Sequence, residues 1–288
     1  MLEQPLSAAK PIARGNTSDV WSWTPATVVK LLHPNIPRHW AAIEADIVTR
    51  VHAAGLPVPA TDGVVEVEGR TGIVLERIDG ELMWERMKSR PRDALGLIDE
   101  LVDLQVQVQL AAVDGLPDLV RRLGSKVDEA VQLSAHDRQR AQRMLAELPA
   151  GNTLCHGDFH PANIMLTERG GVILDWYDAA IGHPTADFVR SSLLMRPPAK
   201  NTWLSGATPQ LLELVHCAYV AELARRQLID AAAFAPWEVV LAVARMSEPV
   251  PTNGLDEIWK RWQSEGPAAA ASMIERCRTL VDRQAEAR

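Results

Sequence analysis

The chain has 288 residues, of which 47% are hydrophobic and 23% charged, an ordinary globular composition that leaves room for one large domain or two modest ones. Its formal net charge of −7 argues against a nucleic-acid partner, because phosphate backbones require clustered lysine and arginine. No window approaches the roughly 20 uncharged residues that a membrane helix needs, so no membrane partner is expected.

The N-terminal stretch and the cysteines indicate the cellular compartment of the protein. MLEQPLSAAKPIARG lacks the basic start and the continuous apolar run of a secretory signal. Cys155, Cys217 and Cys277 are scattered and odd in number, so we expect core thiols in place of a disulfide framework. The sequence therefore predicts a soluble, cytoplasmic protein. It carries no pattern that sets an oligomeric state.

The first eighty residues predict short strands around one helix. Arg38–Ala54 is the helix, because its apolar residues recur at helical spacing and Gly55 followed by Pro57 ends it. The candidate strands are bounded by turn residues, and they are Lys10–Ala13, Val20–Trp23, Thr27–Leu32, Val64–Val67 and Thr71–Ile78.

Helical periodicity dominates from about Arg92 onward, with one β interruption at Ile164–Asp175. The predicted helices are Ala94–Val113, Pro117–Leu133, Asp137–Leu148, Asp187–Leu194, Pro209–Ile229, Trp237–Met246 and, in one or two pieces, Ile258–Glu286. We therefore expect an α+β fold of two lobes. A small β-rich lobe with one main helix spans 1–79, a hinge lies near Glu76–Glu81, and a larger, mostly helical lobe spans 80–288, with a small-molecule site between them.

The stretch LCHGDFHPANIML, Leu154–Leu166, crowds two histidines, an aspartate and an asparagine into eight residues. Such side chains are costly to bury unless something binds them. A zinc site using His156, His160 and the preceding cysteine would need a helix, which Gly157 and Pro161 disfavour. A polar loop capped by its own side chains is the other structural interpretation.

The segment that follows predicts a hairpin. Asn163 and Asp175 lie symmetrically about Arg169, in two short apolar stretches around an Arg-Gly-Gly turn. An antiparallel hairpin in this register pairs Ile164 with Leu174 and places Asn163 beside Asp175.

Asp158 lies on the loop that feeds this hairpin, so three oxygen-bearing side chains are expected to converge. They include too few carboxylates to cage Ca²⁺ but suit a Mg²⁺ ion that keeps waters and borrows phosphate ligands. An aspartate base followed by an asparagine and an aspartate on Mg²⁺ is the arrangement that phosphoryl transfer needs.

LCHGDFHPANIML followed by VILDWYDAAIGHPTADF resembles the catalytic and metal-binding segments of the aminoglycoside phosphotransferase and choline kinase superfamily, whose members share the protein-kinase-like fold. The resemblance implies a Mg²⁺-dependent kinase that moves the γ-phosphate of ATP or GTP to a hydroxyl of a small molecule. It assigns Asp158 to the acceptor hydroxyl, and Asn163 and Asp175 to the metal. The spacing His-Gly-Asp, four residues, Asn and then Asp-Trp is specific.

Supporting roles follow from the same resemblance. His156 would brace the loop, and Asp187 would hold it through backbone amides; the other interpretation of Asp187 is a plain helix cap. His160 is expected to be a packing or capping residue. Trp176 stands where protein kinases carry phenylalanine.

Lys30 interrupts the apolar strand TVVKLL, where a buried ammonium needs an anion. Glu44 lies on the apolar stripe of the next helix and can meet it, whereas Asp46 is rotated away. The resemblance makes this pair the phosphate clamp. The alternative is an edge-strand lysine that reaches solvent.

The rest of the nucleotide site is expected from RGNTSDV, Arg14–Val20, and from the hinge. The loop has one glycine, so Gly15, Thr17 and Ser18 would supply backbone and hydroxyl donors in place of a multi-glycine signature. Backbone groups from Glu76 to Ile78 would bind the nucleobase.

The acceptor is not named by any motif. Aminoglycosides, choline or another amino alcohol, sugars and homoserine-like metabolites all remain candidates. Possible ammonium partners are Glu213, Glu222, Glu238 and Glu248, which a solvated helix face explains equally well. An aromatic cage for a quaternary amine would need Trp21, Trp23, Trp40 and Trp84, which we expect in the core instead. A nucleotide-binding protein without transferase activity and a hydrolase are the rival functions.

Overall fold

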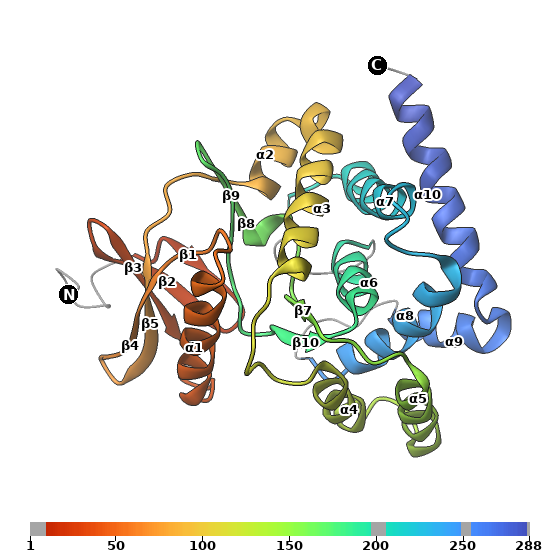
Figure 1. Cartoon of the computed structure of the whole chain (residues 1–288), viewed down its shortest axis with the longest axis horizontal. Helices are drawn as coiled ribbons and strands as arrows, with labels where there is room; N and C mark the ends of the chain where they lie inside the picture. Colours follow the sequence, from red (N-terminus) through yellow and green to blue (C-terminus); the bar gives the residue numbers. More distant parts are fainter. Residues whose placement is uncertain (1–9, 197–205, 249–254, 287–288) are drawn as a thin grey trace.

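The computed structural model describes residues 10–196, 206–248 and 255–286. It contains a sheet lobe and a helical lobe that lie side by side, with the first five strands and α1 on one side and most helices on the other (Figure 1). The predicted α+β architecture of a small β-rich lobe and a larger helical lobe is confirmed.

A five-stranded antiparallel sheet forms the small lobe, in the order β1-β2-β3-β5-β4. Its strands are β1 Ala13–Arg14, β2 Ser18–Thr24, β3 Thr27–Leu32, β4 Thr61–Val67 and β5 Arg70–Glu76. Helix α1, His39–Ala53, packs against β4 and β5 and buries Ile47, Val48 and Val51. Because β3 lies in the middle of the sheet, both of its edges are paired, and the side chains that it points toward α1 are buried.

Two predicted strands of this lobe were misplaced. The first strand is Ala13–Arg14 and not Lys10–Ala13, because Pro11 has no N–H to donate to a ladder. The last ends at Glu76, so Ile78 lies beyond it, after Arg77 has turned to donate to the carbonyl of Ala26.

The helical lobe is built around α6, Pro184–Met195, and α8, Ala231–Arg245, which pack on each other and are buried along most of their length. Helix α10 lies along α7 at the outer side of the lobe (Figure 1). The remaining helices are α2 Met83–Ser89, α3 Ala94–Leu110, α4 Leu119–Glu129, α5 Ala135–Glu147, α7 Pro209–Arg225, α9 Leu255–Glu265 and α10 Ala268–Glu286, with short 3₁₀ turns η1 Pro91–Asp93 and η2 Pro161–Asn163.

Helix existence was predicted better than helix ends. Helix α2 was missed, and α8 begins at Ala231 and not at Trp237, because Pro236 is tolerated inside it. The C-terminal segment forms two helices, α9 and α10, separated at Gly266, whose φ of 57° lies in the left-handed region that favours glycine.

Short strands interrupt the helical lobe at more places than the single expected one. Strand β6, Glu81–Leu82, pairs with β8, Ile164–Thr167, which pairs in turn with β9, Gly170–Ile173. A second pair joins β7, Thr153–Cys155, to β10, Ala180–Gly182. These strands position the loops between them, and they are too short to give a period in the sequence.

Buried side chains form one large core, which fills the helical lobe and includes Ile47, Val48 and Val51 of α1, and two small cores in the sheet lobe. Trp84 lies in the large core and Trp21 in a small one with Val29 and Leu31, whereas Trp40 stacks on Tyr177 with ring centroids 4.3 Å apart. The tryptophans therefore line separate packing regions and do not form an aromatic cage.

Other expectations can be checked against the same residues. Cys155, Cys217 and Cys277 are buried free thiols, as predicted. Among the described residues, no helix combines the length and apolar character required to cross a membrane.

Candidate active site

His156, which is fully buried, supports the loop between β7 and β8 through hydrogen bonds. Its Nε2 lies 3.1 Å from the carbonyl oxygen of Leu174, and its Nδ1 accepts the backbone N–H of Asp158 at 3.2 Å. Burial lowers the pKa of His156, so the ring is neutral and can accept at one nitrogen while donating at the other. His156 thus connects the loop to the end of the β8–β9 hairpin.

Asp158 occupies the exposed side of this loop, with 27% of its side chain accessible. Its carboxylate accepts from Asn163 Nδ2 at 3.0 Å and lies 3.5 Å from His160 Nε2. Burial by itself would raise the pKa of Asp158, but the interactions with His160 and Arg190 outweigh it and hold the pKa below its usual range. Asp158 is therefore an accessible, ionised carboxylate.

His160 is buried, as expected of a packing residue, but its side chain does not cap η2. Its Nε2 lies 3.3 Å from Asn163 Nδ2 and 3.5 Å from the carboxylate of Asp158. The zinc interpretation of this loop is not supported, because the His and Cys side chains that come within ligand distance of one another in the described residues belong to another part of the fold.

The hairpin forms, but its register is one residue away from the predicted one. Ile164 pairs with Ile173 and not with Leu174. The reason is the turn: Thr167 Oγ1 donates to the carbonyl of Gly170 and accepts the N–H of Arg169, which closes a loop of two residues and not three.

The shifted register changes how Asp175 is placed. Leu174 donates to the carbonyl of Asn163 at 2.8 Å, so Asn163 faces Leu174, and Asp175 leaves the ladder one residue later. Asp175 adopts a φ of 62°, in the left-handed region, and 44% of its side chain is accessible. This turn directs its carboxylate to the sheet lobe, where it lies 2.9 Å from Lys30 Nζ.

Lys30 bridges the two lobes. Its Nζ lies 2.7 Å from Glu44 Oε1, as predicted, and Lys30 and Glu44 are only 8% and 3% exposed. Burial alone would lower the pKa of Lys30, but the carboxylates of Asp175 and Glu44 outweigh it and raise the pKa above its ordinary value. The edge-strand interpretation is wrong, because β3 is a central strand, and Asp46 pairs with Arg50 instead.

Asp187 supports the loop from α6. Its Oδ1 accepts the N–H of Gly157 at 2.8 Å, and its Oδ2 accepts from Gln105 Nε2 at 2.8 Å. The alternative of a plain helix cap is wrong, since His183 is the N-cap and its ring accepts the N–H of Thr185.

Four residues contribute to this support in ways that were not anticipated. Gln105, which is completely buried in α3, accepts a hydrogen bond from the hydroxyl of Tyr219 at 2.5 Å. Arg190 donates to the carbonyl of Gly157 at 3.0 Å and pairs with Glu248 at 2.9 Å. The only signal in the sequence was polar residues on otherwise apolar helix faces.

We predict that this network can be tested without touching Asp158. Replacing Gln105 with leucine leaves Asp187 Oδ2 and the Tyr219 hydroxyl without these partners, which costs about 1–3 kcal/mol for each buried group left unpaired. Urea unfolding should show the loss, and Gln107→Leu, an exposed glutamine on the same helix, is the matched control. Equal stability of the two variants would contradict the network.

The expected nucleotide loop is a tight turn between β1 and β2. Gly15 donates to the carbonyl of Ser18 at 2.8 Å, and the carbonyl of Thr17 accepts from His33 at 2.8 Å. Val20 pairs with Lys30, so Ser18, two residues earlier, has its side chain on the same face of the sheet as Lys30.

In the expected hinge, the backbone N–H groups of two residues already make hydrogen bonds within the protein. The N–H of Glu76 donates to Ala60 and that of Arg77 to Ala26, while Glu76 Oε2 accepts from the N–H of Ala60. A nucleobase at this position would therefore have to use backbone carbonyls or the N–H of Ile78.

A cavity opens beside Gly157 in the helical lobe. Basic side chains slightly outnumber acidic ones in its lining, which includes Arg122, Lys126, Arg190, Arg245, Asp178, Asp187 and Glu248. Three of the glutamates considered as ammonium partners are already paired: Glu222 with Arg225 and Arg226, Glu238 with Arg196, and Glu248 with Lys126 and Arg190.

The chain has matches among protein families and among solved structures. A family model described as a phosphotransferase enzyme family matches residues 8–229. No curated protein sequence matches the chain significantly.

Solved structures extend the likeness over most of the chain. A thermostable mutant of an aminoglycoside phosphotransferase, in complex with ADP and hygromycin B, has a TM-score of 0.58 at 14% identity, covering 95% of this chain and 92% of that one. An aminoglycoside phosphotransferase from Streptomyces rimosus, with ADP and streptomycin, gives 0.56 at 16%, covering 82% and 91%. A choline/ethanolamine kinase family protein from Mesorhizobium loti gives 0.50 at 18%, covering 90% of each chain. These likenesses confirm the two-lobed, protein-kinase-like fold.

Proposed function

The chain belongs to the phosphotransferase enzyme family, whose model spans more than half of it, and from this premise we propose that the protein transfers the γ-phosphate of ATP to a hydroxyl group of a small molecule. ATP is favoured over GTP because two of the three similar structures named above were solved with ADP. The residues proposed for the chemistry are Asp158, Asn163, Asp175 and Lys30.

One observation carries the proposal. Lys30 from the sheet lobe and Asp175 from the helical lobe meet at 2.9 Å. Asn163, which donates to Asp158, accepts the N–H of Leu174, the residue before Asp175. These contacts support an interlobe site to which both lobes contribute. It would contain a buried cation, Lys30, a carboxylate suited to metal binding, Asp175, and an accessible ionised base, Asp158. Transfer of a phosphoryl group needs these three elements and little covalent chemistry from the protein.

The donor set fits Mg²⁺. Asp175 offers an accessible carboxylate, and Asn163 directs Nδ2 to Asp158, which leaves its amide oxygen for a metal. When bound with the nucleotide, Mg²⁺ would offset negative charge on the transferring group. Asn163 and Asp175 would hold it.

The roles of the protein groups then follow from their contacts. Asp158 would orient the acceptor hydroxyl and receive its proton, with Asn163 fixing the carboxylate. Lys30, oriented by Glu44, would bind nucleotide phosphates. Gly15, Thr17 and Ser18 would cover the phosphates, and backbone groups between Glu76 and Ile78 would bind the base.

A second proposal concerns the class of acceptor. The cavity beside Gly157 contains four basic and three acidic side chains, and Lys126 and Arg122 lie on α4 at its side. A polycationic aminoglycoside requires a predominantly acidic lining, whereas a zwitterionic or anionic alcohol fits a mixed one. With a volume of about 30 Å³ the cavity could take only a small charged end group of the acceptor. We therefore favour a homoserine-like acceptor, which carries such a group, over an aminoglycoside, choline or a neutral sugar.

Lys126→Gln tests this acceptor class. If Lys126 binds an anionic group, the variant should raise the KM for the acceptor about tenfold, the effect of losing a charge-assisted hydrogen bond, and leave the KM for ATP unchanged. Lys88→Gln is the matched control: both lysines pair with a glutamate, and their side chains are 25% and 24% exposed. Equal KM values in the two variants would contradict an anionic acceptor in this cavity.

The function itself is tested by a coupled nucleotide-turnover assay with Mg²⁺, in which ATP and GTP are run against aminoglycosides, choline-like alcohols, sugars and homoserine. Acceptor-dependent ADP formation supports the proposal and names the acceptor. Phosphate release without any acceptor would indicate a hydrolase. Nucleotide-dependent thermal stabilisation with no turnover across the panel would favour a binding protein without transferase activity.

A further inference from the structure

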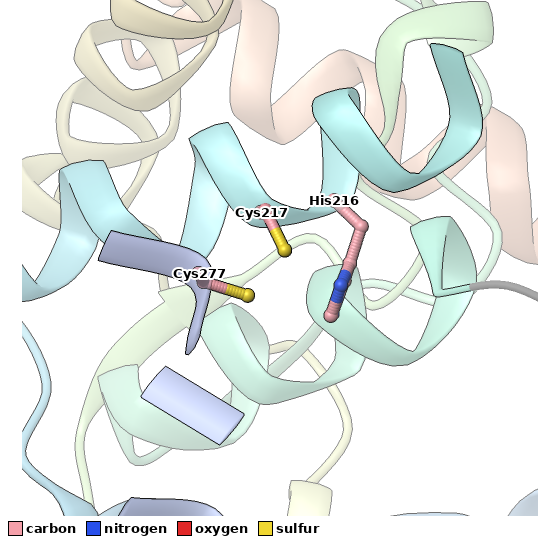
Figure 2. A group of neighbouring side chains, drawn as sticks. All are labelled: His216, Cys217 and Cys277. Carbon is pink, nitrogen blue, oxygen red and sulfur yellow. The ribbon is translucent and has the colours of Figure 1, made fainter. Parts of the chain in front are cut away.

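A cluster of metal-binding side chains lies on the opposite side of the helical lobe from the proposed active site. His216 and Cys217 come from α7 and Cys277 from α10, and Figure 2 shows the two sulfur atoms pointing toward each other with the imidazole beside them. One ligand atom from each residue lies within 4.8 Å of the other two. All three residues are buried, at 2–7% exposure.

The donors are of the kind that zinc prefers. Thiolate sulfur and imidazole nitrogen bind Zn²⁺ at about 2.3 and 2.1 Å, so ligand atoms around one tetrahedral ion are separated by about 3.5–3.8 Å. Side-chain movements of roughly an ångström would bring the present atoms to those separations. The helices need no rearrangement, since α7 and α10 are already packed together.

A neighbouring side chain orients one of the three candidate ligands. Ser192 Oγ lies 3.0 Å from His216 Nε2, and a hydrogen bond at one ring nitrogen fixes the orientation of a metal-bound histidine. His216, Cys217 and Cys277 are all buried, so an ion held between them would be shielded from water.

We propose that His216, Cys217 and Cys277 form a binding site for a thiophilic divalent metal ion of the zinc class, which ties α10 to α7. Binding would release the two thiol protons, so that one divalent ion and two thiolates leave the site uncharged. The thioether of Met273, whose Sδ lies 3.9 Å from Cys277 Sγ, or a water molecule supplies the fourth position. The role of this ion is structural, because the site is closed and lies apart from Asp158.

A disulfide is the rival interpretation of the same cluster. Cross-linking of Cys217 and Cys277 would use both sulfurs and leave His216 without a role, whereas metal binding uses all three donors. The two states differ in thiol count and in optical spectrum, so they can be separated in the unmodified protein.

The experiment uses the full chain purified without chelator. Metal content is measured by mass spectrometry, and the metal-stripped, reduced protein is titrated with Co²⁺, whose bonds to thiolates give a near-ultraviolet charge-transfer band. We expect one Co²⁺ per chain, displaced by Zn²⁺, with loss of the band in Cys217→Ser and Cys277→Ser and a weakened band in His216→Gln. Cys155→Ser, which alters the third buried cysteine, is the matched control and should keep full binding.

The Ser192→Ala variant tests whether Ser192 only orients the metal ligand His216 and does not itself bind the metal. It should weaken Co²⁺ binding about tenfold to a hundredfold, as the loss of such a supporting hydrogen bond does, and keep the charge-transfer band. Absence of a stoichiometric Co²⁺ spectrum in the reduced wild-type protein would overturn the proposal, whatever the variants do. Two missing thiols that reductant restores, without bound metal, would overturn it in favour of a disulfide. Neither result bears on nucleotide turnover.

Discussion

Replacement of Asp158 with alanine should lower turnover by about a hundredfold to ten-thousandfold, the range expected when a positioned general base is removed. Nucleotide binding should remain nearly intact, because the proposed phosphate and metal contacts come from Lys30, Asn163 and Asp175. Asp158 is suited to this role because its carboxylate is accessible and its pKa is held below the usual range. Turnover and nucleotide affinity are measured separately, by coupled assay and by calorimetry.

Asp79→Ala is the control for Asp158→Ala, since the side chain of Asp79 is 84% exposed and pairs only with Arg77 among the contacts seen. Asp158→Asn adds a variant that keeps the size of the side chain and its ability to accept from Asn163. Unchanged turnover in both Asp158 variants would remove this residue from the mechanism.

Replacement of Lys30 with methionine should abolish detectable turnover and also destabilise the protein. Removing one partner of a buried ion pair typically costs about 3–5 kcal/mol, because the remaining charge stays buried. Glu44 is the group left behind, at 3% exposure, while Asp175 can be solvated. Urea unfolding measures the stability, and ATP-dependent thermal stabilisation measures the binding.

A double variant separates the two effects of Lys30. Lys30→Met combined with Glu44→Met replaces the pair by apolar residues of similar size, which is often neutral for stability. We expect the double variant to recover most of the lost stability and none of the turnover. If it is as unstable as the single variant, the destabilisation does not come from the unpaired glutamate.

The contribution of Lys30 to the free energy of unfolding depends on pH in a direction that its pKa sets. The pKa of Lys30 is raised in the folded protein, so its stabilising effect is fully present below the unfolded value of about 10.4 and is lost only as the pH rises through the higher folded value. The titration of Lys30 should therefore add no pH dependence to the stability of the wild-type protein across neutral pH.

Local patterns in the sequence were sufficient for some of the site. The phase of the helix that carries Glu44 predicted its contact with Lys30, and the five-residue spacing of Asp158 and Asn163 placed both on one loop. These features depend on the geometry of a single strand, helix or turn. The turn was also the source of the register error, because closure by Thr167 removes one residue from the loop.

Contacts between distant segments could not be predicted in the same way. Gln105 meets Asp187 and Tyr219 across 82 and 114 residues of sequence, and each residue by itself is an ordinary polar position on an apolar helix. Likewise β7 and β10 exist because tertiary packing brings three-residue segments together. Only the assembled fold gives these residues their partners.

The position of α8 limits where the chain can be truncated. The family match ends at residue 229, and α8 begins at Ala231, yet nearly every side chain from Phe234 to Arg245 is buried against α4, α5 and α6. A polypeptide cut at the family boundary would lack α8 and expose the apolar surfaces of α4, α5 and α6 that α8 covers, so it is expected to aggregate during expression. Any minimal version prepared for crystallisation or for a substrate screen therefore has to keep the chain through α8.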